Sequence, residues 1–155
     1  MVNVKEVMNT SVIKVKRSTS LRALLDIFKQ FHTHPLIPVV DDQDILIGMV
    51  YPENLLDILR PQQAKLFRSL PFMEMDQDVF DLDVVPSMGD LIIVDDIMDK
   101  HFVVAKETQT IEQAYKHMRM HQKERLAVVD SGGKILGIVG IFDIIWRMFK
   151  EKGIA

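Results

Sequence analysis

The chain has 155 residues, of which 48% are hydrophobic, and its formal net charge is −3. That length supports one ordinary domain, or two half-domains that share a core. The near-balanced charge argues against a nucleic-acid binder, which needs a basic excess, and the absence of cysteine excludes disulfides, zinc–cysteine sites and thiol catalysis.

The first sixty residues predict a short strand, an amphipathic helix, a hairpin and a second helix. Val12, Ile13 and Val15 form an apolar strand pattern, and Ser18 or Thr19 can cap the helix that follows. Apolar residues of this helix recur at i, i+3, i+4 and i+7, at Leu21, Leu24, Leu25 and Phe28. The apolar strands LIPVV and ILIGMV flank the turn DDQD, and NLLDIL follows as a helix.

Residues 61–93 separate this half from the next. Three prolines and the acidic run EMDQDVFDLD indicate a connecting segment, with a short helix at QQAKLFRSL. Alternatively, the segment is a lid or docking element, because Phe67, Phe72 and Phe80 make it apolar for a free linker.

Residues 94–155 repeat the first half. VKEVM at 4–8 aligns with VDDIM at 94–98, and VVD at 39–41 recurs at 128–130, which is 89 positions later. The strand FVVA (102–105) precedes a helix that Thr108 can cap. The apolar stripe of that helix is Ile111, Ala114, Tyr115 and Met118. LAVV, DSGG, ILGIVG and DIIWRMF then supply the hairpin and the last helix.

The repeat predicts an α/β fold. Each copy reads β-α-β-β-α and is too small to bury its own helices and sheet, whereas two packed copies can. We therefore expect one domain with pseudo-twofold symmetry, in which the two sheets face each other and the helices lie outside. The predicted repeats are residues 1–60 and 94–155, with a linker at 61–93.

The ordered series of motifs resembles a known family. VKEVM, HTHPLIPVVDD and IGMVYPENLLDIL resemble a cystathionine β-synthase (CBS) domain over residues 4–59, and VDDIM, HQKERLAVVDSGG and LGIVGIFDII do so over residues 94–149. Two in tandem resemble a CBS pair, or Bateman module. With no obvious catalytic or transport domain attached, the chain is similar to stand-alone CBS-pair proteins.

The resemblance implies a function as well as a fold. CBS pairs bind adenosine-containing ligands, such as AMP, ADP, ATP or S-adenosylmethionine, in two clefts between the repeats. They commonly form homodimers through their helices, and they act as regulatory sensors rather than enzymes. The family's ligand signature is a glycine, two apolar residues, a Thr or Ser, two more positions and an Asp.

In the second repeat, Asp143 matches the acid of this signature, and Gly140 replaces the hydroxyl residue. The resemblance places this corner at the start of a helix, where free N–H groups favour phosphate. A carboxylate there can accept hydrogen bonds from the two ribose hydroxyls. The alternative is that Asp143 is an acid that stabilises the helix start and binds no ligand.

In the first repeat, Asn54 replaces the acid and Tyr51 the hydroxyl residue. Asn54 can accept one ribose hydrogen bond or simply cap the helix, and Tyr51 can fill the cleft or stack on a base. Arg125 precedes a buried strand, where it either reaches a ligand phosphate or forms a surface salt bridge.

The pseudo-twofold symmetry divides the candidate residues between two clefts. The preferred cleft would contain Val12, Ile13, His34, Pro35, Leu36, Arg125, Gly140 and Asp143. The second, degraded cleft would contain Phe102, Val103, Glu124, Arg125, His32, Tyr51 and Asn54. Glu124 would repel a phosphate in the second cleft, which is why we favour the first.

Neither a metal site nor a catalytic site is predicted. His32 and His34 lack partners with metal-ligand spacing, and the acidic turn at 41–44 lacks the glycine and distal glutamate of a calcium loop. No nucleophile–base motif is visible, so we expect no enzyme and no cofactor beyond a regulatory nucleotide. No secretory signal or membrane-length apolar run is present, so we expect a cytoplasmic protein.

Two functional hypotheses remain. In the first, one cleft binds an adenosine-containing nucleotide, and the occupied pair signals to an unknown effector protein. In the second, the chain is a dimeric assembly scaffold whose clefts have lost their ligand.

Overall fold

The computed structural model describes residues 1–30, 35–59 and 85–155. The first half contains the 3-10 helix η1 (Val4–Glu6), helix α1 (Leu21–Phe28), strands β1 (Ile37–Val40) and β2 (Leu46–Val50), and helix α2 (Pro52–Leu59). Two short helices follow, α4 (Met88–Leu91) and α5 (Val94–Ile97). The second half contains β3 (Val104–Lys106), α6 (Ile111–His121), β4 (Arg125–Val129), β5 (Ile135–Gly140) and α7 (Ile141–Glu151). The helix predicted at QQAKLFRSL and the phenylalanines of the linker lie outside the described residues.

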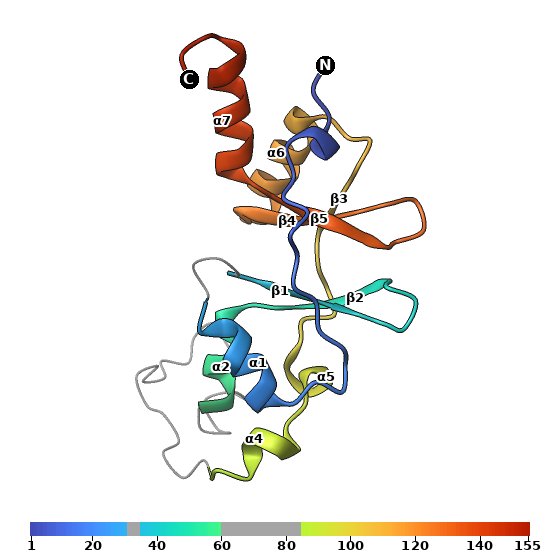
Figure 1. Cartoon of the computed structure of the whole chain (residues 1–155), viewed down its shortest axis with the longest axis vertical. Coiled ribbons are helices and arrows are strands. Elements are labelled where there is room, and N and C mark those ends of the chain that lie inside the picture. The colour runs from blue at the N-terminus through green and yellow to red at the C-terminus, as the bar shows by residue number, and fades with distance from the viewer. Residues whose placement is uncertain (31–34, 60–84) are drawn as a thin grey trace, which may run out of the picture.

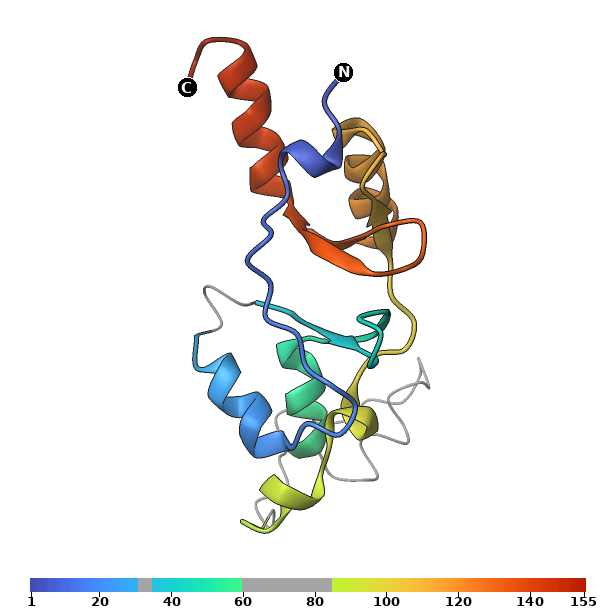
Figure 2. The ribbon, with the colours of Figure 1, turned by 45° about the vertical axis from the view of Figure 1, so that its right-hand side comes forward.

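Two small sheets face each other in the middle of the molecule, and the helices lie on their outer sides (Figures 1 and 2). In the first sheet β1 pairs antiparallel with β2. In the second, β3 runs parallel to β4, and β4 pairs antiparallel with β5. This arrangement confirms the predicted α/β fold of two facing repeats.

The two hairpins meet at their turns. Ile45 and Lys134, which occupy equivalent places in the two repeats, form an isolated antiparallel bridge. Beside it, the N–H of Leu46 donates to the carbonyl of Gly133 at 3.0 Å. Because equivalent residues pair with each other here, the approximate twofold axis passes through this bridge.

The first strand and the helix caps differ from the predictions. In the first repeat, the strand expected at Val12–Val15 is reduced to a single parallel bridge between Val15 and Val39. Each observed cap residue lies one or two positions later in the chain than the predicted one. Ser20 Oγ accepts from the N–H of Ala23 at 3.1 Å, and Thr110 Oγ1 accepts from Gln113 at 3.2 Å. Each helix begins directly after its cap, so these hydroxyls, and not the earlier ones, reach the free N–H groups.

In the part of the chain that the structure describes, three apolar clusters make up the core. The central cluster joins the facing sheets, with Leu36, Val40, Leu46 and Met49 from the first repeat and Ala127, Val129 and Ile135 from the second. The other two clusters lie between each sheet and its helices. β1 is buried along its whole length, as expected for a strand covered on both faces.

The leading segments of the two repeats are exchanged. Val4, at the start of the first repeat, is fully buried in the core of the second repeat, and Val94 is fully buried in the core of the first. Backbone hydrogen bonds fix this crossing, because Val4 N donates to Gln109 O and Val94 N to Thr19 O, both at 2.8 Å. A repeat in the sequence is therefore not a separate half of the structure.

Gly48 and Gly137 make this exchange possible. A Cβ at Gly48 would lie 2.5 Å from Met98 Sδ, and one at Gly137 would lie 2.6 Å from the carbonyl oxygen of Asn9. Both glycines therefore let the exchanged segment of the other repeat pass directly over a strand. The glycine that begins each signature motif has a packing role here.

Candidate functional site

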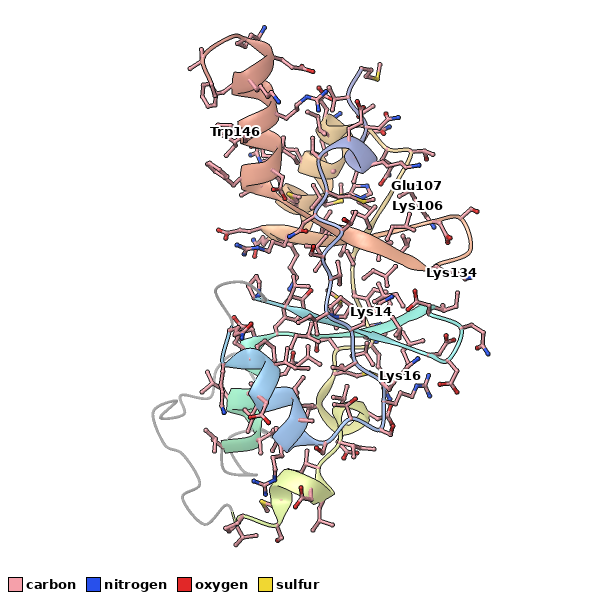
Figure 3. All side chains as sticks on the ribbon, viewed as in Figure 1. Lys14, Lys16, Lys106, Glu107, Lys134 and Trp146 are labelled. Atoms are coloured by element: carbon pink, nitrogen blue, oxygen red, sulfur yellow. The ribbon has the colours of Figure 1, made fainter. Side chains whose placement is uncertain are left out.

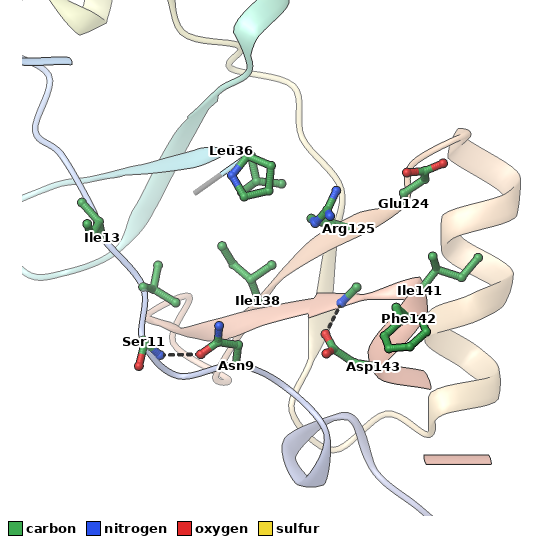
Figure 4. A pocket seen from close by; sticks show the side chains of 13 residues that line it. Asn9, Ser11, Ile13, Leu36, Glu124, Arg125, Ile138, Ile141, Phe142 and Asp143 are labelled. Carbon is green, nitrogen blue, oxygen red and sulfur yellow. Dashed lines mark hydrogen bonds between the residues drawn. The ribbon is translucent and has the colours of Figure 1, made fainter. Parts of the chain in front are cut away.

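The site is built around the corner where β5 ends and α7 begins. Asp143 Oδ2 accepts a hydrogen bond from the N–H of Gly140 at 2.7 Å (Figure 4). The next N–H, that of Ile141, donates to the carbonyl of Glu124 at 2.9 Å. Two of the N–H groups that we expected to favour phosphate are therefore used inside the protein. Asp143 serves the helix start, as the alternative interpretation required, and one carboxylate oxygen remains for other partners.

A cavity of about 230 Å³ opens beside this corner, between the two repeats. Seven of the eight residues predicted for the preferred cleft line it: Val12, Ile13, Pro35, Leu36, Arg125, Gly140 and Asp143. His34 lies outside the described residues. The cavity is also lined by residues that the sequence analysis did not assign to it: Asn9, Ser11, Glu124, Ile138, Ile141 and Phe142.

Arg125 lies on the wall of this cavity (Figure 4). It faces Gly140 across the β4–β5 pair, and a Cβ at Gly140 would lie 3.5 Å from Arg125 Cγ. No ion pair or side-chain hydrogen bond to Arg125 is found within the described ranges, so the surface salt bridge offered as its alternative role is not observed there. The planar guanidinium is free to bind an anion.

The matching corner of the first repeat lies between β2 and α2. Asn54 Oδ1 accepts from the N–H of Tyr51 at 2.7 Å, the same distance as in the Asp143 corner. Asn54 therefore caps its helix, as one of the two interpretations held. Its amide nitrogen donates to Asp99 Oδ1 at 3.4 Å.

Tyr51 is half-buried beside Asn54. Burial, and then the nearby carboxylates of Asp99 and Glu53, raise the pKa of its hydroxyl above the ordinary value. Lys123 Nζ lies 4.4 Å from the centre of its ring, which is a cation–π geometry. The hydroxyl of Tyr51 thus remains protonated at physiological pH, and Lys123 already occupies one face of its ring.

A second cavity of about 450 Å³ lies at this corner. Tyr51, Asn54, Glu124 and Arg125 line it, as predicted for the second cleft, together with Pro35, Leu36, Pro52, Glu53, Asp99, Gln122 and Lys123. The structure does not bring Phe102 and Val103 to this cavity, because they pack against the central cluster and the core of the second repeat. His32 lies outside the described residues.

One wall separates the two cavities and belongs to both. It consists of Pro35 and Leu36 from the first repeat and the equivalent Glu124 and Arg125 from the second. Glu124 therefore faces both cavities, whereas the sequence predicts it only in the second. The single guanidinium of Arg125 likewise serves both.

Each cavity has an aspartate and an asparagine at two equivalent positions, and the two residue types are swapped between the cavities. The Asp143 cavity contains Asn9, whereas the Asn54 cavity contains Asp99 at the position equivalent to Asn9. Sequence reasoning missed Asn9 and Asp99, although both directly follow the aligned motifs VKEVM and VDDIM. Their alignment was the signal that could have identified them.

The described part of the chain also limits other kinds of site. It brings no three His, Asp or Glu side chains together as a group that could hold a metal ion. None of the helices in that part is long and apolar enough to cross a membrane.

Comparison with known proteins places both repeats in one family. The CBS domain family model matches residues 4–61 and 94–150. Among curated proteins, the chain is 26% identical over 135 residues to inosine-5'-monophosphate dehydrogenase of Aquifex aeolicus, covering 87% of this chain but only 22% of that enzyme.

Solved structures share the fold. A structure of CBSX2 in complex with AMP matches with a TM-score of 0.71 and 23% identity, over 98% of this chain and 99% of that one. The CBS domain pair of protein MJ0100, in complex with 5'-methylthioadenosine and S-adenosylmethionine, matches with a TM-score of 0.65 and 18% identity, over 98% of both chains. Both family matches, the facing sheets and the two inter-repeat cavities lead to one conclusion: the chain belongs to the CBS domain family and carries two CBS domains in tandem.

Proposed function

We propose that this protein is a regulatory module that binds an adenosine-containing nucleotide in the Asp143 cavity. One observation carries the proposal: the carboxylate of Asp143 and the guanidinium of Arg125, which has no ion pair with another described residue, line the same cavity between the repeats. This pair suits a ligand with a sugar diol at one end and a phosphate at the other. Fold relatives solved with AMP or with S-adenosylmethionine support the ligand class.

Each part of the cavity suits one part of such a ligand. Val12, Ile13 and Leu36 offer apolar surface to the base, and the second oxygen of Asp143 can accept from ribose. Arg125 is the cation for a phosphate, because two N–H groups of the helix start are already bonded. Among the described residues that line the cavity, Glu124 and Asp143 are the acids and Arg125 is the cation, so the cavity favours a monophosphate or an uncharged adenosyl group over a triphosphate.

In this proposal the protein regulates and does not catalyse. Residues 1–60 and 94–155 are the two repeats of the sensor, residues 61–93 join them, and ligand binding changes the relative orientation of the sheets. Leu36 belongs both to the shared wall of the cavities and to the central cluster that joins the two sheets. A ligand bound against this wall therefore changes the angle between the sheets. The signal passes to an effector protein that recognises one of the two orientations.

A thermal-shift measurement tests this proposal. AMP or S-adenosylmethionine must raise the melting temperature of the wild-type protein, since a ligand that binds only the folded state stabilises it. Asp143→Ala must reduce that rise. No rise with either ligand at millimolar concentration contradicts the proposal and favours the scaffold hypothesis.

We also propose that the chain forms a homodimer through α6 and α7. A groove of about 920 Å³ between these helices is lined mainly by apolar side chains, among them Ile111, Tyr115, Met120, Ile145 and Met148. Trp146, on the outer side of α7, is 51% exposed (Figure 3). A second copy would cover both features through the same helices, which is the self-complementary geometry of a twofold dimer.

A further inference from the structure

The Asn54 cavity lacks a free acceptor at the place where the Asp143 cavity has one. Asn54 and Asp143 each use one oxygen to accept the backbone N–H of the corner, in both cases at 2.7 Å. The remaining polar atom of Asp143 is an oxygen, whereas that of Asn54 is an amide nitrogen. An amide nitrogen only donates, so it cannot accept a hydrogen bond from a ribose hydroxyl.

Asp99 brings a carboxylate to this same place. The amide nitrogen of Asn54 donates to Asp99 Oδ1 at 3.4 Å, and both side chains line the cavity. The backbone of Asp99 is fixed against β2, because Asp99 N donates to Met49 O at 2.8 Å and Met49 N donates to Asp99 O at 3.0 Å. The carboxylate is thus held beside Asn54 by strand pairing, and one of its oxygens is left for a ligand.

The other repeat has the reverse arrangement. Asn9, equivalent to Asp99, pairs with Ile138 through the same two backbone hydrogen bonds, at 2.8 and 2.9 Å. Its side-chain oxygen accepts the N–H of Ser11 at 2.9 Å. Each cavity therefore holds one carboxylate and one amide at two equivalent places, and only the order differs.

We propose that Asp99 is the ribose-binding carboxylate of the Asn54 cavity, which makes this cavity a second site for a nucleoside or nucleoside monophosphate. The inference rests on the proposed function and extends it to a cavity whose helix-start motif has lost its acid. Lys123 and Arg125 are the cations available to a phosphate there. Glu53 and Glu124 keep the cavity from favouring a polyphosphate.

Site-resolved NMR titration with adenosine tests the assignment. The amide of Gln122 reports only on the Asn54 cavity, and that of Ser11 only on the Asp143 cavity. In the wild type both signals shift. Asp99→Asn, which keeps the shape of the side chain, should weaken the Gln122 response about tenfold or more and leave the Kd from Ser11 within about twofold.

Two further variants make the test specific. Asn54→Asp/Asp99→Asn moves the carboxylate to the place that it has in the other cavity, and the Gln122 Kd should return to within about threefold of wild type. Asp95→Asn removes a carboxylate of α5 that lines neither cavity and should change that Kd by less than about twofold.

The outcomes separate the two proposals. The role of Asp99 is overturned if the Kd measured from Gln122 is unchanged in Asp99→Asn. It is also overturned if the double variant Asn54→Asp/Asp99→Asn does not recover the wild-type Kd. A wild-type protein in which adenosine shifts only Ser11 overturns it too, while the proposed function stands. If adenosine and AMP shift neither signal, both proposals are wrong.

Discussion

The carboxylate of Asp143 accepts the backbone N–H of Gly140 at 2.7 Å, across the first turn of α7. Asp143 therefore caps a helix and lines a cavity at once. One oxygen holds the corner in shape, and the other is left for a ligand, so stability and binding meet in one side chain. Substitutions can separate these two effects.

Asp143→Ala should lower the free energy of unfolding by about 1 kcal/mol, because the half-buried N–H of Gly140 loses its partner. Urea denaturation measures this loss. Asp143→Asn keeps an acceptor for that N–H and should lose less than half as much stability, yet it should still weaken adenosine binding. Equal stability losses in the two variants would show that the charge, and not the hydrogen bond, holds the corner.

Gly140→Ser should restore the hydroxyl that the second repeat lacks. A Cβ at Gly140 meets no atom closer than 3.4 Å, and the backbone φ of −108° suits any residue. We expect the better cap to raise the free energy of unfolding by about 0.3 kcal/mol. The added hydroxyl should also strengthen the binding of AMP more than that of adenosine, relative to the wild type. Gly140→Ala adds the Cβ without the hydroxyl and should show neither gain; if it matches the serine variant, the hydroxyl is not the cause.

Asn54→Asp should be destabilising near neutral pH, by about 1 kcal/mol, because it places a second carboxylate beside Asp99. Urea denaturation at neutral pH measures the effect.

Asp99→Asn is the matched partner of that substitution. In the Asn54→Asp background it removes the repulsion, so it should recover most of the lost stability, and the double-mutant cycle should give a coupling of similar size. Additive single effects would mean that the two side chains do not interact in solution.

Arg125→Gln should weaken AMP binding about tenfold and change adenosine binding by less than about threefold, because only AMP carries a phosphate for the guanidinium. Arg125 lies on the wall of both cavities, so in the wild type the binding of one AMP molecule should lower the affinity for a second. Calorimetric titration with each ligand measures both effects. Arg119→Gln, which changes an arginine of α6 outside both cavities, should bind both ligands as the wild type does.

Met148→Glu should convert the proposed dimer into a monomer, because a charge in the apolar groove of α6 and α7 would lose its hydration on association. Sedimentation velocity at tens of micromolar distinguishes the two states. Lys150→Glu changes the charge of the same helix outside the residues that line the groove and should leave the dimer intact. A wild-type monomer at this concentration would contradict the interface.

The sequence by itself predicted the two repeats, the facing sheets and most of the Asp143 cavity. Short apolar runs and helical periodicity identify elements well, and an internal repeat relates the elements to one another. The resemblance to the CBS family singled out Asp143 and Arg125, and the twofold relation of the repeats then assigned them to one cleft with Val12 and Leu36.

Tertiary structure alone decided which residues complete each cavity. Val4 and Val94 pack in the opposite repeats, and this exchange brings Asn9 to the Asp143 corner and Asp99 to the Asn54 corner. Local propensity describes a residue and its neighbours in the chain, whereas the exchange depends on backbone pairing between residues about fifty to one hundred and thirty positions apart. The sequence thus determined that there are two unequal corners, and the long-range packing determined that each brings together one aspartate and one asparagine.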